Sequence, residues 1–278
     1  MTKGTIDPKA EKGKNVGTNY DDWVEEYEPI DLLRVDDIPF YVGLVTETGG
    51  NVLDLTCGTG RITIPIAQAG LDVVGVDNSS QMLLLATERL RDASGVPGSV
   101  EFVHDSILTF NLGKQFDTVL IPYNSFLLFL SVAEQMTVLE RVYAHLKPGG
   151  ILALDLFTPD LWRLTREDSQ LYYRADVTSP NNGTRYVLWE QSTTDNLNQI
   201  IESRYLIENL SPDGKVQNRI YKDVVFRYIH RYEMAHLLTI SGFEDAEVYG
   251  DFQRGDLFEG SEVMVWVAKK PNGVSEKE

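Results

Sequence analysis

Apolar and polar positions follow one pattern over the first 160 residues of the chain. Short runs of β-branched and apolar residues are separated by segments that predict helices, such as the one that Ser79 or Ser80 can cap at its start. The predicted strands are 51–55, 71–76, 100–104, 116–121 and 151–157, and the predicted helices are 61–69, 81–91 and 132–146. Strands that alternate with helices predict an α/β fold with a doubly wound parallel sheet, whose carboxyl edge binds ligands.

The pattern changes after Pro159. Long segments with partial alternation of polar and apolar residues predict extended strands, and turn sequences such as Ser-Pro-Asp-Gly at 211–214 separate them. These strands are expected at 171–178, 185–193, 199–210 and 215–230, followed by a helix at 232–240 and by two closing strands at 243–248 and 263–269. We therefore expect an antiparallel insert in a larger α/β core.

The expected domain organisation follows from this change of pattern. The core comprises residues 19–160 and 231–270, and the insert comprises residues 161–230. Residues 1–18 and 271–278 are polar and are expected to be disordered tails.

Composition narrows the classes of partner. The 278 residues include 42 acidic and 25 basic ones, a net charge of −17, which argues against nucleic acid as a partner. Cys57 is the single cysteine, so neither an intramolecular disulfide nor a cysteine-based zinc site is predicted, and no metal is expected. No apolar run is long enough to cross a membrane, and the first residues do not resemble a signal peptide. These features predict a cytoplasmic protein that acts on a small molecule.

Acidic residues end three successive predicted strands: Asp54, Asp77 and Asp105. One such residue alone is most simply a helix cap, but three of them beside the glycine turn at 56–60 indicate a binding site. Thr63 stands where a dinucleotide-binding fingerprint has its third glycine, and Asp54 would repel a pyrophosphate. Asp77 suits the two hydroxyls of a ribose and Asp105 an exocyclic amine, so the pattern favours a cofactor without phosphates.

In these motifs the chain resembles the class I S-adenosylmethionine-dependent methyltransferases. The matching segments, in the order of that family, are VLDLTCGTG at 52–60, VDNS at 76–79, FVHDS at 102–106, FDTV at 116–119 and LKPGG at 146–150. The resemblance covers about residues 20–157. It implies a Rossmann-like, mostly parallel sheet of seven strands, S-adenosylmethionine as the cofactor and S-adenosylhomocysteine as the product.

The resemblance also implies a role for individual residues. Gly58 and Gly60 let the backbone approach the methionine part, Asp77 binds the ribose and Met82 lies against the adenine. The adenine edge meets three residues after the third strand: Asp105, Ser106 and Ile107. The expected cofactor-binding residues are Tyr20, Asp54, Thr56, Gly58, Gly60, Asp77, Asn78, Met82, Asp105, Ser106, Ile107 and Pro122.

Tyr20 belongs to the segment 20–23, Tyr-Asp-Asp-Trp. Many small-molecule members of the family have a Tyr-Asp run there that closes over the cofactor. The resemblance therefore implies that Tyr20 contacts the methionine carboxylate or the sulfonium. The alternative is an aromatic residue that packs an N-terminal helix onto the sheet, and for Tyr27 both interpretations stay open.

The methyl acceptor is expected after the fourth strand, where the family places it. Tyr123 and His230 are the expected catalytic residues, and Asn124, Phe126 and Arg231 are the expected substrate-binding residues. His230 and Arg231 precede the last helix and can face the same cavity, although a surface position is the alternative. The Asn-Pro-Pro-Tyr signature of many nucleic-acid amino methyltransferases is absent, which favours a small acceptor.

The insert is expected to act as a lid above the methyl donor. Similar inserts occur in methyltransferases that act on glycine, on amino sugars and on peptide N-termini. An exposed edge of the insert can also pair with a second copy of the chain, so a homodimer is the alternative role.

We expect methyl transfer to a small acceptor, with an amine nitrogen favoured because an acidic cavity attracts and holds a cation. Two alternatives remain: O-methylation of a small hydroxylated metabolite, and a non-catalytic regulator that binds S-adenosylmethionine.

Overall fold

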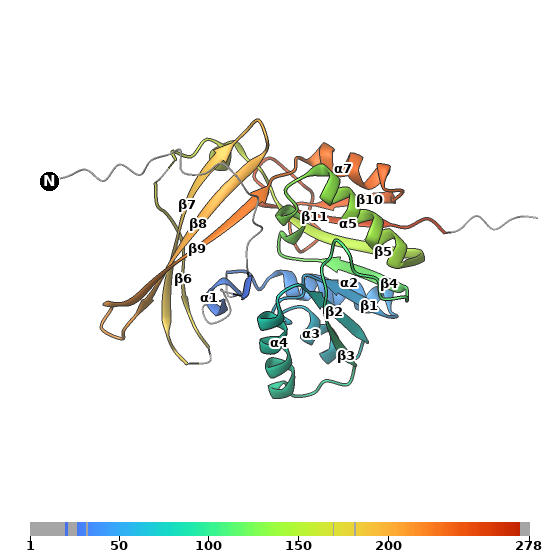
Figure 1. The fold of residues 1–278 in the computed structure, drawn as a ribbon, viewed down its shortest axis with the longest axis horizontal. Coiled ribbons are helices and arrows are strands. Elements are labelled where there is room, and N and C mark those ends of the chain that lie inside the picture. Colours follow the sequence, from blue (N-terminus) through green and yellow to red (C-terminus); the bar gives the residue numbers. More distant parts are fainter. Residues whose placement is uncertain (1–19, 22–26, 32, 169, 181, 273–278) are drawn as a thin grey trace, which may run out of the picture.

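The computed structural model describes residues 20–21, 27–31, 33–168, 170–180 and 182–272 (Figure 1). The expected tail at 1–18 and residues 273–278 of the other tail lie outside the described residues. The described chain forms two sheets, one of seven strands and one of four.

The seven-stranded sheet has the order β10-β11-β5-β4-β1-β2-β3. Its strands are β1 (Val52–Leu55), β2 (Val73–Asp77), β3 (Val100–His104), β4 (Phe116–Ile121), β5 (Leu146–Phe157), β10 (Glu244–Tyr249) and β11 (Val263–Lys269). Pairings among β1 to β5 are parallel, and β11 runs antiparallel to both of its neighbours. This confirms the predicted mostly parallel, Rossmann-like sheet, including its two closing strands.

Helices cover both faces of this sheet. The helices are α1 (Glu28–Asp31), α2 (Asp37–Thr48), α3 (Thr63–Gln68), α4 (Ser80–Asp92), η2 (Ser125–Leu128), α5 (Val132–His145), α6 (Leu161–Leu164) and α7 (Arg231–Ile240). On one face of the sheet, apolar residues of α5 and α7 form a buried cluster with residues of the strands. On the other face, apolar residues of α2 and α3 form a second buried cluster with residues of the strands. Local signals explain two helix starts, because Ser79 caps α4 and Ser131 forms a capping box with Glu134 in α5. The sequence pattern does not predict α2.

The predicted insert forms an antiparallel sheet of four strands in the order β6-β7-β8-β9. Its strands are β6 (Tyr172–Thr178), β7 (Arg185–Asp195), β8 (Ile200–Leu210) and β9 (Val216–Arg227). Figure 1 shows this sheet beside the first one, with α1 between them. Leu188, Ile207 and Val224 on one face of it share a buried cluster with Ile30 and Met82, so the second sheet is packed onto the cofactor-binding half.

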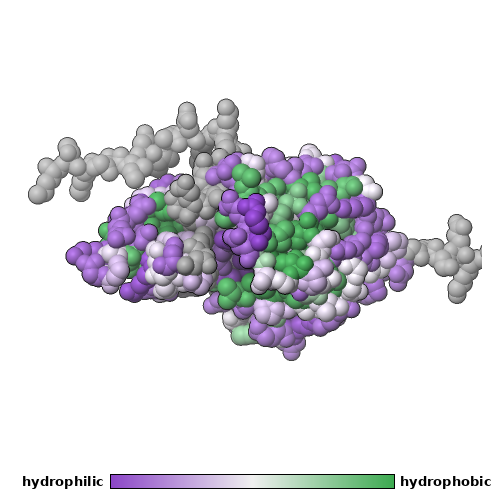
Figure 2. Space-filling view, turned by 90° about the horizontal axis from the view of Figure 1, so that it is seen from below, coloured by the Kyte–Doolittle hydropathy of each residue, from purple (hydrophilic) through white to green (hydrophobic). Residues whose placement is uncertain are grey.

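The surface differs between the two parts. In Figure 2 hydrophilic residues cover most of the end formed by the second sheet, while apolar patches gather over the other part. Within the described ranges, none of the helices has the length and hydropathy that a membrane span requires.

Candidate active site

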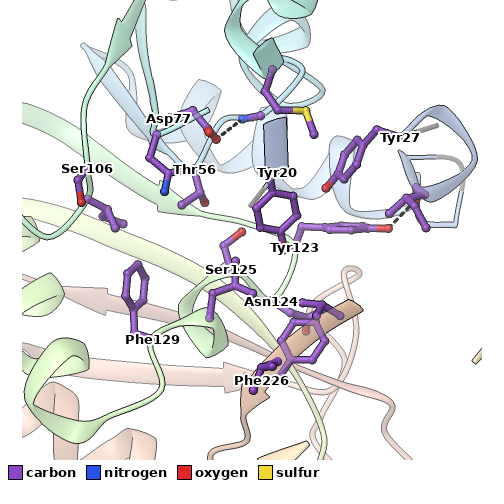
Figure 3. A pocket seen from close by; sticks show the side chains of 18 of the residues that line it. Tyr20, Tyr27, Thr56, Asp77, Ser106, Tyr123, Asn124, Ser125, Phe129 and Phe226 are labelled. Atoms are coloured by element: carbon purple, nitrogen blue, oxygen red, sulfur yellow. Dashed lines mark hydrogen bonds between the residues drawn. The ribbon is translucent and has the colours of Figure 1, made fainter. Parts of the chain in front are cut away.

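A cavity of about 360 Å³ lies between the carboxyl edge of the first sheet and the second sheet (Figure 3). The turn after β1, the ends of β2, β3 and β4, the segment around α1 and one face of the second sheet all contribute to its walls. Parallel strands bring their carboxyl ends to one edge, which explains why motifs distant in sequence meet here. Predicted site residues that line this cavity are Tyr20, Thr56, Gly58, Asp77, Asn78, Met82, Asp105, Ser106, Ile107, Tyr123 and Asn124.

Asp77 ends β2 and holds the glycine turn. Its Oδ2 accepts a hydrogen bond from the backbone N–H of Gly58 at 2.8 Å, and its Oδ1 accepts one from Ser79 at 2.8 Å. The residue is 8% exposed, and this burial raises the pKa of the carboxyl group, against the effect of the backbone N–H groups. The carboxylate is thus fixed at the wall of the cavity, in a position suited to a ribose.

The two glycines of the turn have different surroundings. Gly58 has φ +53°, and a Cβ built there would meet no atom within 4 Å. The backbone is therefore open toward the cavity that Gly58 lines, which allows close approach of a ligand. Gly60 has φ +77°, but its Cβ would lie 3.1 Å from Cδ1 of Ile64. Gly60 does not line the cavity, and its lack of a side chain allows helix α3 to pack closely. Its expected approach to the cofactor stays a prediction.

Asp54 lines a smaller adjoining cavity of about 50 Å³, together with Pro122. Its Oδ2 accepts a hydrogen bond from Thr63 Oγ1 at 2.6 Å, whereas within the described part of the chain its buried Oδ1 has no partner. Burial raises the pKa of this carboxyl group to about 7, although Thr63 and the charge of Arg61 oppose the shift. A bound ammonium group would satisfy Oδ1 and keep Asp54 ionised. Thr63, in the position where dinucleotide binders have their third glycine, thus donates a hydrogen bond to Asp54.

The expected adenine side of the cavity combines apolar and polar residues. Met82 and Ile107 are buried and supply apolar contact surface. Asp105 accepts a hydrogen bond from the backbone N–H of Ser106 at 2.7 Å. Asp105 therefore caps its own turn and lines the cavity as well, so the capping and binding interpretations both describe its geometry.

Three tyrosines form the wall next to the N-terminal segment. Figure 3 shows the rings of Tyr20, Tyr27 and Tyr123 close together, and the centroids of the first two are 6.3 Å apart. The Tyr123 hydroxyl donates to the carbonyl oxygen of Ile30 at 2.6 Å and so ties α1 to the end of β4. Tyr20 thus combines a packing role with a place in the cavity wall. Of the segment 20–23, Asp22 and Trp23 lie outside the described residues.

Asp155 organises the turn after β4, and sequence reasoning missed it. Tyr123 and Asn124 have φ of 63° and 61°, which non-glycine residues rarely adopt. Asp155 Oδ1 accepts from the Tyr123 N–H at 2.7 Å and Oδ2 from the Asn124 N–H at 3.2 Å. The same buried carboxylate accepts from Tyr41 at 2.6 Å and pairs with Arg34 at 2.7 Å. The signal in the sequence is one acidic residue inside the apolar run of β5.

His230 and Arg231, two predicted site residues at the start of α7, lie outside the cavity. His230 is exposed and sets its ring against Tyr228, at 5.5 Å between centroids, and Arg231 places its guanidinium over Tyr232. Neither lines the cavity, so the expectation that they face the acceptor is wrong. The physical reason is that the buried residues Tyr228 and Ile229 hold the chain in the core up to this point, and the chain reaches solvent at His230.

Phe126 is also misplaced as a substrate-binding residue. It is 0% exposed and belongs to the main apolar core, with its ring 6.4 Å from that of Phe129. Full burial of this aromatic ring in the core removes apolar surface from water, which is more favourable than a position at the cavity wall. Phe129, three residues later, lines the cavity instead.

The second sheet contributes residues that sequence reasoning did not single out. Arg174 on β6, Tyr205 on β8 and Val224, Val225 and Phe226 on β9 line the cavity. The alternating pattern predicts these strands but does not indicate which face meets the first sheet.

Comparisons with known proteins agree with this geometry. Residues 52–150 match the family described as "Methyltransferase domain". The cypemycin N-terminal methyltransferase of Streptomyces sp. is 33% identical over 188 residues, which are 67% of this chain and 64% of that protein. The glycine/sarcosine N-methyltransferase of Aphanothece halophytica is 29% identical over 244 residues, 83% of this chain and 80% of that protein.

The same fold occurs in the solved structure of the CcbJ methyltransferase from Streptomyces caelestis. It has a TM-score of 0.77 at 24% identity and covers 92% of this chain and 97% of its own. The fold and cavity define a class I methyltransferase, and the chain belongs to the S-adenosylmethionine-dependent methyltransferases. Two solved structures with this fold, at 21% and 23% identity, contain S-adenosylmethionine, which agrees with the predicted cofactor.

Proposed function

We propose that the protein transfers a methyl group from S-adenosylmethionine to an amine nitrogen of a small acceptor. The observation that carries this proposal is the chemistry of the cavity wall. Among the described residues that line the cavity there is no histidine, lysine or cysteine. Its carboxylates are Asp77, Asp105 and Glu134, and each of them already accepts a hydrogen bond from a backbone N–H. The wall therefore offers no imidazole, amine or thiolate as a general base. A hydroxyl acceptor needs such a base, whereas an amine that has lost its proton is already a nucleophile.

The phenols of the cavity support the same choice. Burial raises the pKa of its tyrosines, which are Tyr20, Tyr27, Tyr123 and Tyr205. They are therefore neutral at physiological pH and cannot serve as phenolate bases. Their rings present electron-rich faces, which attract a cation such as the donor or an ammonium acceptor.

Asn124 is proposed to orient the acceptor. Its side-chain Oδ1 is buried and, among the described atoms, has no hydrogen-bond partner, and the residue lines the cavity. An amine N–H can donate to this oxygen, which aims the nitrogen lone pair. Asp155 holds the Asn124 backbone in its left-handed conformation and thereby fixes the direction of that side chain.

The bound cofactor supplies a cationic sulfonium whose methyl group is the electrophile. The chain has to align the acceptor with it, at ~3–3.5 Å between reacting atoms, and to exclude water. We assign the ribose to Asp77, the ammonium group to Asp54 and the adenine to the wall with Met82 and Ile107. The second sheet is proposed as the lid, because Phe226 and its neighbours close the cavity opposite these residues.

Two relatives support an amine acceptor by their names. One is called an N-terminal methyltransferase of cypemycin and the other a glycine/sarcosine N-methyltransferase. The first name refers to an N-terminus and the second to the nitrogen of glycine or sarcosine.

Release of S-adenosylhomocysteine from S-adenosylmethionine tests the proposal. The panel contains small amines and, for each, the alcohol or phenol of the same skeleton. We expect turnover with at least one amine and none with its hydroxyl counterpart. Turnover of hydroxyl acceptors alone would contradict N-methylation. Binding of S-adenosylhomocysteine without turnover of any acceptor would favour the non-catalytic regulator.

A further inference from the structure

Three arginines surround one glutamate beside the second-sheet wall of the cavity. Arg166 Nη1 lies 3.1 Å and Arg174 Nη1 3.6 Å from the same oxygen, Oε2 of Glu190. The other oxygen of Glu190 accepts from Ser203 Oγ at 2.9 Å. Arg163 has no ion pair with a described carboxylate, yet the charges of Arg174 and Glu190 both act on it. The arginine cluster, Arg163, Arg166 and Arg174, therefore carries more positive charge than Glu190 neutralises.

Several donors of the cluster are unused. Within the part of the chain that the structure describes, Nε of Arg163 and both Nε and Nη2 of Arg166 are buried without a hydrogen-bond partner. Aromatic faces hold the guanidinium groups in place: Arg166 lies 3.8 Å from the ring centre of Trp162, and Arg163 4.5 Å from that of Phe157. Rings offer no hydrogen-bond acceptor of carboxylate strength. Arg163 and Arg166 do not line the cavity, so their unpaired donors add positive charge behind Arg174 that the described carboxylates do not fully neutralise.

Arg174 connects the cluster with the cavity. It lines the cavity next to Tyr205, and its side chain is 30% exposed. Arg34 lines the cavity too, but it is committed to Asp155 at 2.7 Å. Arg174 is less tightly paired, at 3.6 Å from Glu190, and can turn toward a ligand.

Charge is distributed unevenly around the cavity. Asp77 and Asp105 lie on the side assigned to the cofactor, and Glu134 of α5 also lines the cavity. Arg174 of β6 is the member of the arginine cluster that lines it, on the side of the second sheet. The nearby charges of the three arginines also act on the phenol of Tyr205, where they oppose the rise in its pKa. The positive side is therefore the side left to the methyl acceptor.

We propose that the arginine cluster binds a carboxylate of the methyl acceptor, with Arg174 as its direct contact. The acceptor is then an amine that carries a carboxylate, an amino acid or a short peptide, rather than a simple cationic amine. Guanidinium groups bind carboxylates through two parallel hydrogen bonds, which fixes orientation as well as position. The amine is thereby directed toward Asn124. The net charge of −17 gives the whole protein no general attraction for anions, so a local cluster is needed.

This proposal rests on the proposed N-methylation, and paired acceptors test it. The pairs are glycine and glycinamide, alanine and alaninamide, and a tripeptide with its C-terminal amide. Each pair shares the amine and differs in the carboxylate. We expect the wild-type KM to be at least tenfold lower for the acid of a pair. Arg174→Gln should remove this preference by raising the KM for the acid at least tenfold.

Two further variants make the result specific. Arg174→Lys keeps the charge without the planar fork, so it should recover part of the preference for the acid. Arg204→Gln is the matched control, because Arg204 pairs with Asp223 on the same sheet but does not line the cavity. It should keep the wild-type preference. An equal KM for acid and amide in the wild type, or an unchanged preference in Arg174→Gln, would overturn the proposal.

Binding of acetate separates this proposal from N-methylation itself. Calorimetry with the protein saturated with S-adenosylhomocysteine, at constant ionic strength in chloride, requires no turnover. We expect acetate to bind to the wild type and at least tenfold more weakly to Arg174→Gln. If no amine is methylated but acetate binding depends on Arg174, N-methylation fails and the carboxylate site stands. If amines are methylated but acetate does not bind, the carboxylate site fails alone.

Discussion

Replacement of Asp77 by asparagine tests the cofactor site most directly. Asparagine has nearly the size of aspartate, so the packing of β2 is retained and the negative charge is lost. In the wild type the two carboxylate oxygens accept from the backbone N–H groups of Gly58 and Ser79, both at 2.8 Å. In Asp77→Asn one of these N–H groups faces the side-chain NH2, which is itself a donor. The glycine turn then loses one of its two anchors.

The expected loss follows from the charge on these bonds. A hydrogen bond to a charged group contributes roughly 1.5–3 kcal/mol, about twice as much as one between neutral groups. We therefore expect Asp77→Asn to weaken binding of S-adenosylhomocysteine by ~1.5–3 kcal/mol, which corresponds to roughly 10- to 150-fold. The measurement is isothermal titration calorimetry at one pH and one ionic strength.

The control is Asp72→Asn. Asp72 also accepts from a backbone N–H, that of Ser99 at 3.0 Å, but it is exposed and does not line the cavity. It should bind S-adenosylhomocysteine as the wild type does. Wild-type affinity in Asp77→Asn, with a folded protein by circular dichroism, would refute the assignment of Asp77 to the ribose.

Three further variants probe neighbouring groups. Burial raises the pKa of Asp54 to about 7, above the ordinary value of 3.8, so the folded protein holds a proton there that the unfolded chain releases. The free energy of unfolding should therefore fall as pH rises from about 4 to 7. Asp54→Asn should flatten this slope in urea titrations. Tyr123→Phe removes the bond to Ile30 and should lower kcat/KM for the acceptor about tenfold, ~1.4 kcal/mol, in steady-state assays; unchanged kinetics would refute a role for α1 in the site. Asp155→Ala should lower the free energy of unfolding by ~3–5 kcal/mol in urea titrations, because it leaves the Arg34 charge and three further donors unpaired; a loss below 1 kcal/mol would contradict this.

Local chemistry made the core of the fold predictable from the sequence. The strands of the first sheet, the glycine turn at 56–60 and the acidic strand ends are each encoded within a few neighbouring residues. Parallel pairing then brings the strand ends to one edge whatever the details of packing. For this reason Asp77, Met82 and Ile107 were expected at one cavity, and they line it together.

Other features depend on contacts between distant residues, and the sequence pattern does not show them. Asp155 meets Tyr41 and Arg34 across 114 and 121 positions, and Arg166 meets Glu190 across 24 positions. The periodicity of apolar and polar residues does not indicate which buried charged residues pair with each other.

The sequence by itself therefore determined the class of the protein and predicted its cofactor, and most of the residues predicted to bind the cofactor line the cavity. Those properties follow from short motifs whose geometry is local. Only the tertiary structure decided that His230 faces solvent, that Phe126 is buried in the core and that Arg174 reaches the cavity. The direction of these side chains depends on how the second sheet packs against the first, and that packing is set by the whole buried surface rather than by any one segment.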